Sequence, residues 1–123
     1  MTNYIKELNV EEAFREIKEG AILIDIRNKE ELEVFSFDIL NVIHIPQNMI
    51  YDQLYKIPKD KTVIIGCNSG TRSYFMTQIL SEMNFKNIYN LRGGILDWVE
   101  KGLPVLWDNY KKEVSNQHEL KQQ

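Results

Sequence analysis

The sequence predicts an α/β fold, in which a central and mostly parallel sheet of about five strands carries helices on both faces. Two short apolar runs, residues 21–26 and 61–66, are continuous rather than alternating, which is typical of strands that are buried on both sides. Segments with helical periodicity lie between the strands, as parallel strands require. The length of 123 residues, with 43% hydrophobic and 27% charged residues, fits one globular domain.

The clearest helix is predicted over residues 9–20. Asn9 is a good N-cap, and Glu12 three residues later completes a capping-box pair. Gly20 then ends the helix. An apolar stripe at helical spacing is expected to face the core, formed by Val10, Ala13, Phe14 and Ile17.

The remaining elements alternate along the chain. Strands are predicted over residues 21–26, 41–46, 61–66 and 87–91, and helices over residues 28–35, 48–57 and 71–85, followed by a glycine turn and a short helix that ends at Gly102. Partial burial is expected for Met49, Leu54 and Ile57. A core-facing stripe is expected from Phe75, Met76, Ile79, Leu80 and Met83. Residues 1–108 are expected to form the domain, and residues 109–123 a polar tail that is a frayed helix or disordered.

Composition excludes several classes of protein. The net charge is −3 and no Lys/Arg block stands out, so we expect no nucleic-acid partner. No apolar run approaches the roughly 20 residues of a membrane helix, and the polar N-terminus is unlike a secretory signal. A single cysteine rules out an internal disulfide and fits a cytoplasmic location. One cysteine and two histidines are too few for a typical structural zinc site, and nothing indicates an organic cofactor.

The stretch CNSGTRS, residues 67–73, contains the only cysteine of the chain. It joins strand 61–66 to the next helix, at the edge of the sheet where α/β proteins bind ligands. Unpaired N–H groups at a helix start receive anions and favour a thiolate over a thiol. A lone cysteine is most often a small buried hydrophobe. Here the small loop residues and the nearby cation of Arg72 instead favour a reactive Cys67.

This loop resembles the active-site loop of the rhodanese, or sulfurtransferase, family, C-x-x-G-x-R-[ST]. Three other segments match that family in order: LIDIR at residues 23–27, the Ile-Pro at residues 45–46, and NIYNLRGGILDW at residues 87–98. The resemblance covers roughly residues 3–104 and implies a rhodanese-like fold.

By this resemblance, Cys67 is the nucleophile that takes a sulfane sulfur from a donor and becomes a persulfide. The rest of the active-site loop, which would bind the substrate and stabilise the persulfide anion, is Asn68, Ser69, Gly70, Thr71, Arg72 and Ser73. The expected partners are a small sulfur donor, a thiol or cyanide acceptor, or a sulfur-relay protein. Arg72 either holds the loop shape or contacts substrate, and the sequence favours neither role.

Asp25 and Arg27 match the D-x-R of the family. They form either a charge network near the loop or, as we favour, a structural ion pair at a strand end. The segment FDILNV at residues 37–42 departs from the family, which usually carries G-H-I-P-G-A there, so Asp38 stands in place of the histidine of that motif. We assign no functional role to this segment. Structural roles are expected for Gly93 and Gly94 in a turn, Trp98 in the core and His44 in a strand.

Two other functions compete with sulfur transfer. Cysteine phosphatases and arsenate reductases use a C-x-x-x-x-x-R loop, whereas Cys67 and Arg72 stand in C-x-x-x-x-R. The shorter loop makes a tighter ring of N–H groups, which suits one sulfur atom better than a phosphate. A non-catalytic binding or regulatory module is the other alternative. With one cation in the loop, we expect a persulfide donor to be preferred over doubly charged thiosulfate, and discharge to need an external acceptor.

Overall fold

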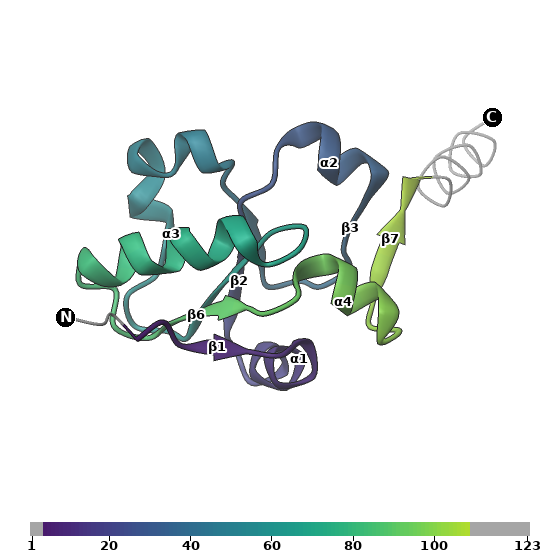
Figure 1. Cartoon of the computed structure of the whole chain (residues 1–123), viewed down its shortest axis with the longest axis horizontal. Coiled ribbons are helices and arrows are strands. Elements are labelled where there is room, and N and C mark those ends of the chain that lie inside the picture. The colour runs from purple at the N-terminus through teal and green to yellow at the C-terminus, as the bar shows by residue number, and fades with distance from the viewer. Residues whose placement is uncertain (1–3, 109–123) are drawn as a thin grey trace, which may run out of the picture.

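A computed structural model describes residues 4–108 of the chain (Figure 1). Its centre is a five-stranded sheet in the order β1-β6-β5-β2-β4, and every neighbouring pair is parallel. In that order the strands are Glu7–Leu8, Ile88–Leu91, Val63–Gly66, Ile22–Asp25 and Val42–His44. The predicted parallel sheet is therefore confirmed, and the unpredicted β1 completes it. The polar tail predicted for residues 109–123 lies outside the described residues.

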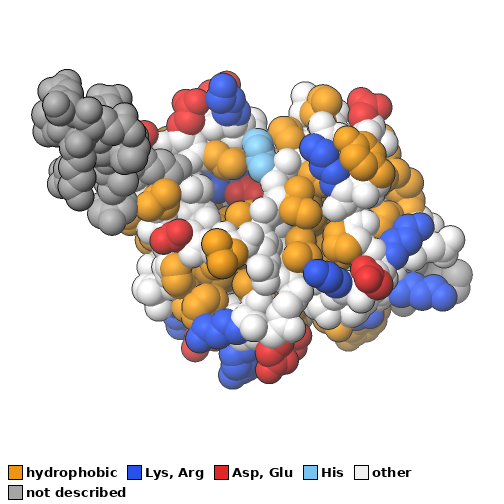
Figure 2. All heavy atoms as spheres, turned by 180° about the vertical axis from the view of Figure 1, so that it is seen from behind, with side chains coloured by type: hydrophobic (Ala, Val, Ile, Leu, Met, Phe, Trp, Pro, Cys, Tyr) orange, Lys and Arg blue, Asp and Glu red, His pale blue; other side chains and the backbone are white. Residues whose placement is uncertain are grey.

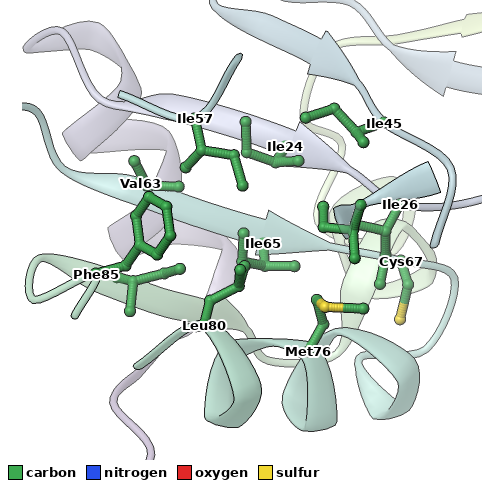
Figure 3. Close-up of a cluster of buried hydrophobic side chains, with 12 residues drawn as sticks. Ile24, Ile26, Ile45, Ile57, Val63, Ile65, Cys67, Met76, Leu80 and Phe85 are labelled. Carbon is green, nitrogen blue, oxygen red and sulfur yellow. The ribbon is translucent and has the colours of Figure 1, made fainter. Parts of the chain in front are cut away.

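Helices cover both faces of the sheet, as predicted. The α-helices are α1 (Val10–Lys18), α2 (Lys29–Val34), α3 (Thr71–Glu82) and α4 (Gly94–Glu100), and two 3-10 segments are η1 (Gln47–Met49) and η2 (Tyr51–Lys56). Successive strand residues point to opposite faces. Ile24 and Ile65 pack on the α3 side with Leu80 (Figure 3), whereas Leu23 and Ile64 pack in a second cluster with α1 and α4.

Local signals account for the start of α1. The Asn9 side chain accepts a hydrogen bond from the Glu12 N–H at 2.8 Å, and the Glu12 carboxylate accepts one from the Asn9 N–H at 2.9 Å, so the predicted capping box is formed. The helix packs its apolar stripe near Trp98, which is fully buried and meets the rings of Phe14 and Phe37 edge-on. The predicted core position of Trp98 is confirmed.

Two predicted helices differ from the structure. Residues 47–56 form 3-10 turns rather than an α-helix, with Gln53 outside helical geometry, and Met49 is exposed. A 3-10 turn rises about 2.0 Å per residue against 1.5 Å for an α-helix, so the segment covers more of the return path from β4 to β5. Phe75 in α3 and Met83 directly after it are 58% and 38% exposed, contrary to the predicted core stripe.

The difference between the buried face of α3 and the predicted face has a local cause. Its buried face carries Ser73 and Thr77 together with Met76 and Leu80. The Thr77 hydroxyl donates to the Ser73 carbonyl at 2.7 Å, which satisfies a buried polar group inside the helix. Burying Ser73 brings it to the cysteine loop, and Phe75 is thereby turned outward.

A second, two-stranded sheet was not predicted. Strands β3 (Phe35–Phe37) and β7 (Val105–Trp107) pair antiparallel at one end of the molecule. The ring of Phe35 stacks on Trp107 at 5.1 Å, and Phe37 is buried in the core. The predicted helix over residues 28–35 consequently ends at Val34, where the chain turns into β3.

Candidate active site

Cys67 lies directly after β5, at the carboxyl end of a central strand and immediately before α3. The loop closes tightly because Gly70 adopts a φ of +94°, in the region that favours glycine. A Cβ at this position would lie 2.9 Å from the Gly93 nitrogen and 3.1 Å from the Leu91 carbonyl oxygen. Gly70 thus lets the loop fold back against the end of β6.

Two backbone amides and a hydroxyl group surround the Cys67 sulfur. The N–H of Gly70 donates to Sγ at 3.2 Å and the N–H of Ser73 at 3.4 Å, while the Ser73 hydroxyl lies 3.2 Å away. The Ser73 amide belongs to the first turn of α3 and has no partner within the helix. Cys67 is only 1% exposed. A sulfur anion formed at this position during a reaction would meet these groups without any rearrangement of the loop.

The glycine pair after β6 packs against the backbone of the Cys67 loop. Gly93 and Gly94 both have positive φ, as expected for the predicted turn. The turn also brings the first amides of α4 to the loop, since Ile95 donates to the Cys67 carbonyl at 3.0 Å and Leu96 to the Asn68 carbonyl at 3.1 Å. A Cβ on Gly94 would lie 2.4 Å from the Asn68 oxygen, so only glycine fits there.

Asn90 adds a further support that sequence reasoning missed. Its side-chain amide donates to the Gly70 carbonyl at 3.2 Å and to Glu7 at 2.8 Å, and Asn90 is buried in β6. The available signal was an asparagine inside the predicted strand 87–91, because an amide in a covered strand needs hydrogen-bond partners.

Arg72 forms a two-point ion pair with Glu31 in α2. Its Nη1 and Nη2 donate to Oε1 and Oε2 at 2.8 and 2.7 Å. These hydrogen bonds lower the pKa of the Glu31 carboxyl and raise that of the Arg72 guanidinium. The arginine therefore anchors the loop to α2, with its charge largely balanced.

Glu31 was not singled out in the sequence. Its carboxylate also accepts the Asn28 N–H at 3.1 Å, while the Asn28 side chain accepts the Glu31 N–H at 2.9 Å. The capping-box spacing of Asn28 and Glu31 was a readable signal for the start of α2. It contained no information on the contact with Arg72.

Asp25 and Arg27 form a buried ion pair. Arg27 Nη2 lies 2.9 Å from Asp25 Oδ2, and both side chains are at most 2% exposed. Arg27 also donates to the Phe35 carbonyl at 3.2 Å, and its own carbonyl lies 2.6 Å from His44 Nε2. Within residues 4–108, the side-chain hydrogen bonds of this pair go to framework groups and none goes to the Cys67 loop. These contacts are those of an ion pair at a strand end, while the charges of Arg27 and Asp25 also act on Glu31 and Arg72, so the choice between the two roles stays a prediction.

A cavity of about 560 Å³ adjoins the site. It is lined by Ile26, Asn28, Pro46, Gln47, Asn48, Tyr51, Arg72, Met76 and Ile79. Cys67 does not line it, but Ile26 and Met76 belong to the same buried cluster as the thiol and lie beside it in Figure 3. None of the divergent residues 37–42 lines this cavity.

Other kinds of site find no support in the described residues. Among residues 4–108, no group of three or more His, Cys, Asp and Glu side chains is placed to hold a metal ion. None of the helices in this part of the chain is long and apolar enough to cross a membrane. On the face seen in Figure 2, basic and acidic side chains are interspersed, without a continuous basic patch.

The fold and the loop define an α/β protein with a buried cysteine held by backbone amides at the carboxyl edge of its sheet. Residues 9–101 match the rhodanese-like domain, and the chain belongs to that family. A protein named sulfurtransferase from Allochromatium vinosum is 36% identical over 88 residues, which cover 72% of this chain and 80% of the relative.

Two further comparisons bear on the range of the family. The polysulfide-sulfur transferase homodimer of Wolinella succinogenes has a TM-score of 0.74 at 31% identity, covering 83% of this chain and 78% of the other. The tRNA uridine(34) hydroxylase of Erwinia tasmaniensis is 33% identical over 69% of this chain, which spans only 27% of that longer protein. Relatives of this domain thus carry names of different activities.

Proposed function

We propose that the protein is a sulfurtransferase that moves a sulfane sulfur from thiosulfate or a persulfide to a thiophilic acceptor through Cys67. In the first step the Cys67 thiolate attacks the outer sulfur of the donor. A new S–S bond forms as the donor S–S bond breaks, and the electron pair leaves with a thiolate or sulfite. In the second step a thiolate or cyanide attacks the outer sulfur of the Cys67 persulfide and regenerates the thiolate.

The observation that carries this proposal is the set of donors around Cys67 Sγ. The amides of Gly70 and Ser73 and the Ser73 hydroxyl converge on one atom from within 3.4 Å. An attacking or leaving sulfur anion needs such preorganised donors, because they stabilise its charge without rearranging. The similarity to proteins named sulfurtransferases supports the same reaction.

The geometry gives less support to a phosphatase. A transferred phosphoryl group needs a cation and N–H groups directed at several oxygens. Here two N–H groups of Arg72 already donate to the Glu31 carboxylate, and the amides of Gly70 and Ser73 already donate to the sulfur. A phosphate at this site would therefore face the short loop of amides around Cys67 and an Arg72 whose charge is already paired with Glu31.

Cys67 is the only cysteine of the 123 residues, so its persulfide has no thiol within the chain that can displace it as a disulfide. Discharge consequently depends on an external acceptor, which is a small thiol, cyanide or a sulfur-relay protein. A cytoplasmic location remains a prediction from cysteine usage.

Intact mass spectrometry tests the proposal. The full chain is exposed to glutathione persulfide, freed of donor and weighed with and without added thiol, beside Cys67→Ser. We expect one added sulfur on the wild type, its retention without acceptor, its loss with thiol, and no addition to the variant. A wild type that gains no sulfur would favour a non-catalytic binding module, and equal loss with and without thiol would contradict the need for an acceptor.

A further inference from the structure

Gly70 holds one of the two backbone amides that reach the Cys67 sulfur. Its N–H donates to Sγ at 3.2 Å, and its φ of +94° is a conformation that a glycine both enters and leaves easily. Gly70 is also the N-cap of α3, and a glycine has no side chain with which to cap that helix. The loop therefore needs support from outside α3 if this amide is to stay directed at the sulfur.

That support comes from the side chain of Asn90 in β6. Its amide nitrogen donates to the Gly70 carbonyl at 3.2 Å, and the same carbonyl accepts the Tyr74 N–H at 3.2 Å in the first turn of α3. Asn90 Nδ2 also donates to Glu7 Oε2 at 2.8 Å. The two hydrogens of one amide thus join the start of α3 to strand β1.

Strand β1 fixes the orientation of this amide. β1 lies along β6 at one edge of the sheet (Figure 1), and Glu7 stands opposite Asn90 in the register of the two strands. The backbone N–H of Asn90 donates to the Lys6 carbonyl at 2.9 Å, so backbone and side chain both bind β1. Because Glu7 and Gly70 both present acceptors to the side chain, the amide nitrogen rather than the oxygen has to face them.

This orientation leaves the Asn90 oxygen without a partner. Asn90 is 1% exposed, and no group among residues 4–108 donates to its Oδ1. A buried acceptor without a hydrogen bond lowers the stability of a fold, whereas an apolar side chain in the same strand does not. If Asn90 were apolar, the Gly70 carbonyl would keep the Tyr74 amide as a donor, and the half-buried Glu7 would be hydrated. The carboxamide thus contributes to the position of the loop rather than to the stability of the sheet.

We infer that Asn90 is a positioning residue for sulfur transfer, which together with Glu7 keeps the Gly70 amide directed at Cys67 Sγ. The inference rests on the proposed function. Within the described residues, the hydrogen bonds to Sγ come from Gly70 and Ser73, so Asn90 and Glu7 act through Gly70. A fixed amide stabilises negative charge on Sγ without rearranging, whereas a loop free to move would first have to bring that amide back.

The test compares Asn90→Val with the control Asn41→Val. Asn41 directly precedes β4, at the amino end of the parallel strands, and its amide donates to the Ile17 and Ala21 carbonyls at 3.0 and 3.3 Å. Each variant loses two amide hydrogen bonds, but only Asn90→Val loses one to the cysteine loop. Sulfur uptake from glutathione persulfide is timed by intact mass spectrometry. We expect uptake to slow roughly three- to tenfold in Asn90→Val, as the loss of one neutral hydrogen bond predicts, and to keep the wild-type rate in the control.

A second measurement does not depend on turnover. Hydrogen exchange of the Gly70 amide, followed by NMR, should be roughly three- to tenfold faster in Asn90→Val than in the wild type and unchanged in the control. The melting temperature of Asn90→Val should be unchanged or a few degrees higher, whereas the control should melt at a lower temperature. Glu7→Ala, at a half-buried position, should speed the exchange and slow the uptake by a smaller factor, and it serves as the test if Asn90→Val does not fold.

Wild-type uptake and wild-type Gly70 exchange in both Asn90→Val and Glu7→Ala would overturn the inference, while sulfur transfer itself stood. Equal changes of uptake and exchange in Asn41→Val would overturn it as well, because a general loss of stability would then explain them. A wild type that takes up no sulfur would instead overturn the proposed function, and with it the role of Asn90 in sulfur transfer.

Discussion

Arg72 and Glu31, 41 positions apart in the chain, form an ion pair through both terminal nitrogens of the guanidinium and both oxygens of the carboxylate. Arg72 lies in the part of the active-site loop that forms the first turn of α3, and Glu31 lies in the first turn of α2. The pair thus ties the cysteine loop to the segment that follows a neighbouring strand. It also decides how much positive charge an incoming donor meets.

Glu31→Gln should raise the efficiency of thiosulfate as a donor. Glutamine keeps the size and the capping position but removes the charge that balances Arg72. We expect kcat/KM for thiosulfate to rise about three- to tenfold, as an exposed charge a few ångströms from a dianion is worth on the order of 1 kcal/mol. Steady-state transfer measures the effect, with the exposed neighbour Glu30→Gln as control. A loss with every donor would show that the pair acts only by shaping the loop.

The same pair predicts an effect of acid on stability. The hydrogen bonds from Arg72 hold the pKa of Glu31 below its ordinary value of 4.5. The stabilisation is therefore fully present above that value and is lost as the pH falls through the lower folded-state pKa. Because the two side chains are 37% and 26% exposed, the contribution should be at most about 1 kcal/mol.

Urea unfolding at several pH values measures this contribution. Glu31→Gln should be less stable than the wild type at pH 7, and the difference should shrink as the pH falls below 4.5 and the wild-type carboxyl is protonated. The exposed Glu33→Gln should show no such convergence. A difference that stays constant into acid would mean that the ion pair contributes no charge-dependent stability.

Ser73→Ala should shorten the lifetime of the Cys67 persulfide. The change removes the hydroxyl 3.2 Å from Sγ and leaves the amide in place. Losing one hydrogen bond to an anion corresponds to roughly a ten- to hundredfold effect. Timed intact mass spectra after donor removal provide the measurement. Ser69→Ala is the control, since that exposed hydroxyl contacts Thr71 instead, and equal lifetimes in both variants would contradict the role of Ser73.

Gly94→Ala should disrupt the cysteine loop. The added Cβ would meet the Asn68 and Cys67 carbonyls at 2.4 and 2.6 Å, in addition to the strain of a φ of +61°. We expect a loss of stability of about 2 kcal/mol or more and little persulfide formation. Gly102→Ala is a matched control, because its φ is +71° but nothing lies within 4 Å of its Cβ.

Thermal melts and persulfide formation together distinguish the strain of an alanine at positive φ from the steric clash of its Cβ with the loop carbonyls. The control should lose only about 1 kcal/mol and keep its loading, since a left-handed residue costs about that much without a clash. If Gly94→Ala formed as much persulfide as Gly102→Ala, the close contact between the start of α4 and the Cys67 loop would not be needed for persulfide formation.

Much of this site was readable from local patterns. The apolar runs around Ile24 and Ile65 predicted two central strands. The position of the cysteine loop between a predicted strand and a predicted helix identified it as a candidate site. Phe75 shows the limit of such patterns. Its helical spacing suggested burial, but the contact of Ser73 with Cys67 turned α3 and left Phe75 exposed.

By itself the sequence determined the parallel sheet, the capping of α1, and the placing of Cys67 and Gly70 between a strand and a helix, because these depend on residues that are neighbours in the chain. Only the tertiary structure decided that Glu31 would balance Arg72, that Gly94 would press against the Asn68 carbonyl, and that β3 would pair with β7. Such contacts join segments far apart in the sequence, and they exist only once the packing of the sheet and helices has brought those segments together.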